Sequence, residues 1–82
     1  MIPLILLESG KKAIIRKING GIGAKQQLVN LGIVEGTIIV LKSKLGNNFG
    51  PIMITIVDDK TNTYRDVAIG WGLASKILVE EL

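Results

Sequence analysis

The sequence predicts an all-β fold: a small antiparallel barrel with one short helix after the first strand and a short helical turn before the last strand. Three observations lead to this prediction. About five segments are rich in β-branched residues, tight turns of Gly, Asn and Asp join most of them, and one segment alone has a convincing helical period. A length of 82 residues allows one domain, and we expect residues 1–82 to form it.

The first strand is expected over residues 11–18, KKAIIRKI, which mix charged with β-branched side chains. The apolar run 1–10 precedes it, and two interpretations of that run stay open: it pairs with the barrel, or it docks elsewhere. Three glycines in residues 19–23, NGGIG, indicate a loop whose backbone needs positive φ angles.

The helix is expected over residues 24–32. Ala24, Leu28 and Leu31 stand at positions i, i+4 and i+7, which lie on one face of a helix. Gly32 follows where a glycine commonly ends a helix.

After Gly36 the pattern changes from a helical period to strands. Residues 45–50 and 58–62 carry turn-forming Asn, Asp and Gly, and residues 70–75 can hold one helical turn. The remaining strands are expected at 37–44, 51–57, 63–69 and 76–82.

The composition excludes several kinds of chemistry. The chain has no Cys and no His, so it lacks thiol catalysis, a thiolate metal site and the side chain that most often transfers protons near pH 7. The net charge of +3 is too small and too scattered for a dedicated nucleic-acid binder, and we expect no nucleic acid as partner. The longest apolar run is too short for a membrane span, so a cytoplasmic location is expected.

The motifs offer little catalytic chemistry. NGGIG lacks the Lys and the Ser or Thr of a phosphate-binding loop, and its glycines do not have the spacing of a dinucleotide site. Asp58 and Asp59 are weak candidates for a hard-cation site with Asn62, and the competing interpretation is that they are solvated turn residues. No catalytic residue and no cofactor is predicted.

A few side chains are candidates for contact with another protein. Trp71 stands between two glycines, where it either packs in the core or projects as an anchor, and Phe49 and Leu45 carry the same ambiguity. The apolar share of 48% is high for a small monomer, which makes a weak homo-oligomer an expectation as well.

The order of these elements resembles the FeoA family (ferrous iron transport protein A), which includes a related C-terminal domain of iron-dependent repressors. The resemblance runs from end to end and is strongest over residues 28–37, LVNLGIVEGT; residues 45–51 and 67–80 are similar to the family's hairpin and closing strand. The residues that carry this resemblance are expected to specify the fold: Leu28, Leu31, Gly32, Gly36, Gly50, Pro51 and Ala74.

The resemblance implies an SH3-like barrel and a non-enzymatic accessory of ferrous iron uptake. Its implied partner is the cytosolic GTPase domain of a FeoB-like transporter, and an association with Fe²⁺ is implied only by the family. The alternative is a weak divalent-metal-binding or metal-sensing domain. The expected partner-binding residues are three apolar side chains with three basic ones at their rim: Leu45, Phe49, Trp71, Lys42, Lys44 and Arg65.

Overall fold

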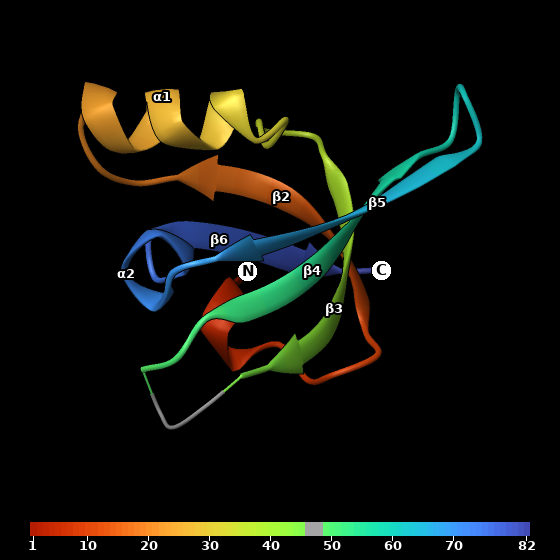
Figure 1. Ribbon diagram of the computed structural model, residues 1–82, viewed down its shortest axis with the longest axis horizontal. Helices are drawn as coiled ribbons and strands as arrows, with labels where there is room; N and C mark the ends of the chain where they lie inside the picture. Colours follow the sequence, from red (N-terminus) through yellow and green to blue (C-terminus); the bar gives the residue numbers. More distant parts are fainter. Residues whose placement is uncertain (46–48) are drawn as a thin grey trace.

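The computed structural model describes residues 1–45 and 49–82 (Figure 1). Its main feature is one antiparallel sheet of six strands in the order β1-β6-β2-β3-β4-β5. The strands are β1 (Ile2–Pro3), β2 (Lys12–Ile18), β3 (Ile38–Lys44), β4 (Ile52–Asp58), β5 (Thr63–Ile69) and β6 (Ile77–Glu81). The helical segments are the 3₁₀ turn η1 (Leu4–Leu6), α1 (Ile22–Asn30) and α2 (Trp71–Ala74).

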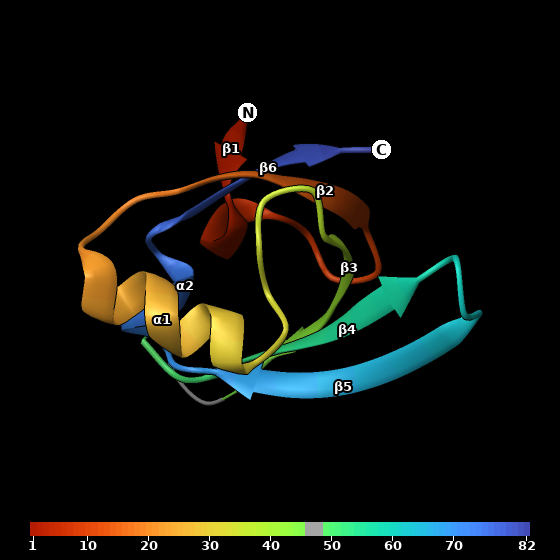
Figure 2. The same ribbon diagram turned by 90° about the horizontal axis from the view of Figure 1, so that it is seen from above.

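The predicted fold class is confirmed. The strands bend around a common core as in a small SH3-like barrel, α1 follows β2, and α2 precedes β6. The barrel is not closed by hydrogen bonds, because β5 pairs with β4 and, within residues 1–45 and 49–82, has no second strand beside it. The hairpin of β4 and β5 projects beyond the rest of the sheet, at the end of the molecule away from α1, as Figure 2 shows.

The apolar run at the start of the chain pairs with the barrel, which settles the question that the sequence left open. Ile2 lies opposite Val79 and Pro3 opposite Leu78, so β1 is a sixth strand that the sequence pattern did not reveal. The chain then turns through η1 and buries Leu4 and Leu7 almost completely. A two-residue strand is too short to show a period of two, which is why the pattern missed it.

The core is built from aliphatic side chains. Strands β2 to β6 each turn alternate residues inward, and η1, α1 and α2 add one buried side chain each, so the sheet and the helical segments share one core cluster. The fully buried large side chains include Leu4, Leu7, Ile15, Leu28, Ile33, Ile39, Leu41, Ile54, Ile69, Ile77 and Val79.

Helix α1 begins at Ile22, two residues before the predicted start, with Gly21 as an N-cap that makes no side-chain hydrogen bond. Its C-terminal end fits the prediction that Gly32 ends the helix. Gly32 has a φ of +83°, its amide donates to the Val29 carbonyl, and the Ile33 amide donates to the Leu28 carbonyl at 2.8 Å. This is the Schellman pattern, and the fully buried Leu28 and Ile33 supply the apolar contact that accompanies it.

Candidate functional site

The structure places the six predicted partner-binding residues in three different surroundings. The first is an apolar corner, which we define as Leu6, Leu45, Phe49 and Trp71. Phe49 meets Trp71 edge to face, with ring centroids 4.9 Å apart and an interplanar angle of 80°. Leu45 is 43% exposed, Leu6 64% and Phe49 74%. Three of the four side chains are therefore exposed, and Trp71, which Phe49 contacts, is half-buried.

Lys44 ties the elements of the apolar corner together. Its Nζ donates to the carbonyl of Ile5 at 2.6 Å, which holds the end of β3 against η1. Helix α2, which begins with Trp71, lies against η1. Trp71 is half-buried and packs on the core, as the first of its two interpretations expects, and it also supports the exposed Phe49.

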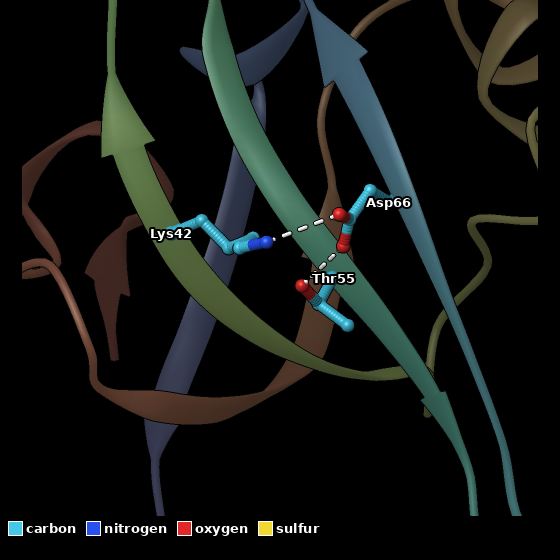
Figure 3. Close-up of polar contacts among 3 residues, drawn as sticks. All are labelled: Lys42, Thr55 and Asp66. Carbon is cyan, nitrogen blue, oxygen red and sulfur yellow. Dashed lines mark hydrogen bonds and ion pairs between the residues drawn. The ribbon is translucent and has the colours of Figure 1, made fainter.

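Lys42 lies elsewhere, on the outer face of the sheet. The register of β3 against β4 shifts between Leu41 and Ser43, and Lys42 occupies this bulge. Its Nζ lies 3.1 Å from Oδ2 of Asp66 on β5, and Oγ1 of Thr55 on β4 donates to Oδ1 of Asp66 at 2.7 Å (Figure 3). Three neighbouring strands thus contribute one side chain each to a single polar cluster.

The electrostatics of this cluster favour an ionised Asp66. The hydrogen bond from Thr55 lowers the pKa of Asp66 below its ordinary value, and the hydrogen bond and positive charge of Lys42 lower it further. All three residues are open to solvent or partly so. Thr55 and Asp66 were not among the predicted site residues. Their place on adjacent outer-face positions is a consequence of the β4–β5 register, which local sequence does not reveal.

Arg65 lies in the third of these surroundings, where its contacts are with helix α1 of its own chain. Its Nη2 donates to the carbonyl of Leu31 at 2.6 Å, at the C-terminal end of α1. A positive charge is favourable there because the last carbonyls of a helix carry partial negative charge. Arg65 also contacts Gly32 so closely that a β-carbon on Gly32 would collide with the guanidinium. Arg65 therefore joins β5 to α1.

The residues expected to specify the fold occupy positions that explain their types. Leu28 and Ala74 are fully buried and Leu31 is partly buried against the core. Gly36, like Gly32, has a positive φ, of 93°, a conformation that other residues rarely adopt. The carbonyl of Pro51 accepts a hydrogen bond from the Leu45 amide across the base of the hairpin, next to the half-buried Gly50.

Asp58 and Asp59, the weak metal candidates, lie at the β4–β5 turn. Oδ1 of Asp58 accepts hydrogen bonds from the amides of Lys60 at 3.0 Å and Thr61 at 3.4 Å, which is the geometry of a turn-forming Asp. Both acids and Glu35 line an open groove of about 520 Å³. Within residues 1–45 and 49–82, however, no three His, Cys, Asp or Glu residues lie close enough to hold one metal ion.

The helices of the described segments are all too short for a membrane span.

Comparison with known proteins shows which family has this architecture. A family model described as the FeoA domain matches residues 2–81. The chain belongs to the FeoA family. A protein of Methanocaldococcus jannaschii named as an Fe(2+) transport protein A is 37% identical over 81 residues, which are 99% of this chain and 88% of that protein.

Solved structures of FeoA proteins have the same fold. A crystal structure of an iron uptake regulatory protein, FeoA, aligns with a TM-score of 0.80 at 33% identity and covers 99% of this chain and 97% of that one. The NMR structure of a FeoA-like protein from Clostridium acetobutylicum also aligns with a TM-score of 0.80, at 25% identity, over 99% of this chain and 86% of that one. The resemblance noted in the sequence is thus confirmed as family membership.

Proposed function

We propose that this FeoA-family chain is a non-enzymatic cytoplasmic accessory of ferrous iron transport, acting as one domain over residues 1–82. Its partner in this proposal is the cytosolic GTPase domain of a FeoB-like transporter. The names of the M. jannaschii relative and of the FeoA crystal structure, which refer to Fe(2+) transport and iron uptake, support the role in iron. Fe²⁺ enters here as the transported cargo and not as a bound cofactor.

The apolar corner is the observation that carries the choice of a protein partner. Phe49 is 74% exposed, yet it rests on a Trp71 that the core holds in place. A rigid aromatic pair at the surface loses little conformational entropy on binding, and such residues dominate the energetics of protein interfaces. Lys44, anchored to η1, supplies a positive charge at the rim.

Amide NMR spectra of the labelled chain test this proposal during addition of the GTPase domain, first with GDP and then with a GTP analogue. We expect shifts confined to η1, the end of β3 and α2. Phe49→Ala should weaken binding by about tenfold or more, as truncation of an interface anchor does. Tyr64→Ala is the matched control, because Tyr64 is 66% exposed and lies on the projecting hairpin, in the strand that does not contribute to the corner.

Each outcome has a distinct meaning. Shifts on the apolar corner that Phe49→Ala removes and Tyr64→Ala preserves support the adaptor role. Unchanged spectra in both nucleotide states contradict the GTPase contact. Tight one-to-one uptake of Fe²⁺ in equilibrium dialysis, with shifts around Asp58 and Asp59, would favour the alternative of a metal-sensing domain.

A further inference from the structure

Strand β5 forms an open edge of the sheet. It stands last in the strand order, pairs with β4 along all seven residues, and has no strand on its other side in the part of the chain that the structure describes. Within the described residues, none of the backbone hydrogen bonds of turns and loops involves a residue of Thr63–Ile69. The outward amides and carbonyls of β5 are therefore available to another strand, which is the usual consequence of an uncovered sheet edge.

Side chains that commonly guard such an edge do not do so here. Strand β5 contains neither Pro nor Lys, and its two charges are held by the molecule's own groups. Asp66 is bound by Thr55 and Lys42 on the outer face, toward β4 and β3. Arg65 is bound to the Leu31 carbonyl at the end of α1. Neither charge has to be stripped of its partner for a strand to approach the edge.

The far end of β5 is also open. Ala68 is small and exposed, and a β-carbon added to Gly70 would meet no other atom within 4 Å. Neither residue therefore presents a bulky side chain at this end of the strand.

We propose that this edge pairs with β5 of a second copy of the chain, antiparallel and related by a two-fold axis. In such a pairing both strands must turn the same residues to the same face, so residue i lies opposite residue j only when i and j are both odd or both even. Three registers meet this condition near the middle of the strand, centred on Arg65, Asp66 or Val67.

Charge selects one of the three. A register centred on Arg65 sets that residue opposite its own copy, and a register centred on Asp66 does the same with a carboxylate; like charges directly opposite one another destabilise a sheet. The register centred on Val67 sets Asp66 opposite Ala68 of the second copy and Arg65 opposite Ile69. Strand β5 can thus pair with its own copy with both charges opposite small or apolar residues, which is the reason to assign the edge to a second copy.

The proposal stands apart from the transporter, because it concerns the isolated chain. Pairing of one strand from each copy buries a small interface, so the dimer should be weak and visible only at high concentration. Sedimentation equilibrium and amide NMR spectra from about 20 µM to about 1 mM cover the range in which such a contact is half-formed. We expect a rising average mass and concentration-dependent shifts confined to β5 and its neighbour β4.

Two opposite charges at one position test the register. Ala68→Glu sets a carboxylate opposite Asp66 twice in the two-fold dimer, whereas Ala68→Lys sets an ammonium there. From the size of cross-strand charge effects we expect self-association of the Glu variant to be about tenfold weaker than that of the Lys variant. Gln27→Glu is the matched control for charge alone, because Gln27 is exposed on α1, and it should associate as the unchanged chain does.

Urea unfolding of each variant shows whether it is folded before its mass is interpreted. A chain that stays monomeric to about 1 mM contradicts the proposal, since the strand contact would then be too weak to matter. Shifts centred on α1 or the apolar corner would show self-association through another surface and would equally contradict it. Equal association of the Glu and Lys variants would overturn the register centred on Val67.

Discussion

The two edge strands of the sheet, β1 and β5, differ in length and in the features that limit pairing with a further strand. β1 has two residues, one of which is Pro3, which has no amide proton to donate. Directly after it the chain turns through η1 and buries Leu4. β5 has seven residues without a Pro, and Arg65 and Asp66 are held by α1, β3 and β4. At the β1 edge, the proline and the buried turn that follows limit pairing with a further strand. At the β5 edge, such pairing depends on how the charged side chains are held within their own molecule.

This comparison predicts that residues beside β1 contribute strongly to the stability of the whole domain. The polar groups on β5 should contribute much less to it. Substitutions beside β1 should therefore have large effects, and substitutions of the polar groups on β5 smaller ones.

The largest effect is expected for Leu4→Ala. Leu4 is fully buried directly after β1, and truncation of a buried leucine leaves a cavity that typically costs about 2–5 kcal/mol of folding free energy. Urea unfolding monitored by circular dichroism measures this cost. Leu6→Ala, two residues later and 64% exposed, is the control and should cost under about 0.5 kcal/mol. Similar losses in both variants would show that η1 does not anchor the β1 edge in the core.

Gly32→Ala should have an intermediate effect. At Gly32, φ is +83° and a β-carbon would collide with the guanidinium of Arg65, so we expect a loss of about 1–3 kcal/mol. The collision is with the end of a flexible side chain. In an Arg65→Ala background the same substitution should therefore cost less, with only the backbone strain remaining. A double-mutant cycle of unfolding free energies measures the difference, and strict additivity would contradict the contact between β5 and the end of α1.

The sequence predicted most of this architecture because most of it is encoded locally. The helix end at Gly32, the strands after Gly36 and the helical turn at Trp71 each depend on residues a few positions apart. The candidate site was harder to predict, because it depends on register and long-range contacts. Phe49 and Trp71 do lie together as candidates for one surface, but Lys42 and Arg65 are used in contacts with Asp66 and Leu31.

The missed residues have the same explanation. Thr55 meets Asp66 only because β4 and β5 pair with these two positions opposite each other. The alternation of Met53 and Thr55 with the buried Ile52, Ile54 and Ile56 does predict that Thr55 faces outward, yet it gives no partner. β1 was missed because its partner, β6, lies at the other end of the chain.

The smallest effect is expected from Asp66, and it should depend on pH. Contacts with Thr55 and Lys42 lower the pKa of Asp66 in the folded protein, whereas in the unfolded chain its pKa is near the ordinary value of about 3.9. Its contribution to stability is therefore fully present above that value and is lost as the pH falls through the lower pKa of the folded state. Asp66→Asn carries no such charge. The difference in unfolding free energy between the unchanged chain and Asp66→Asn should then shrink as the pH is lowered from neutral to below about 4.

Thr55→Val sharpens this test, because it removes the hydroxyl donor that lowers the pKa of Asp66 most while it retains Lys42. An NMR titration of the Asp66 carboxyl carbon should show a higher pKa in Thr55→Val than in the unchanged chain. Unfolding measured across the same pH range should show that the loss of stability on acidification is smaller in this variant. If the carboxyl titrates alike in both proteins, the Thr55 hydroxyl does not donate to Asp66 as described, and Lys42 is left as the group that holds this carboxylate on the outer face. The claim that the charge of Asp66 is already engaged within its own molecule would then depend on the ion pair with Lys42 alone.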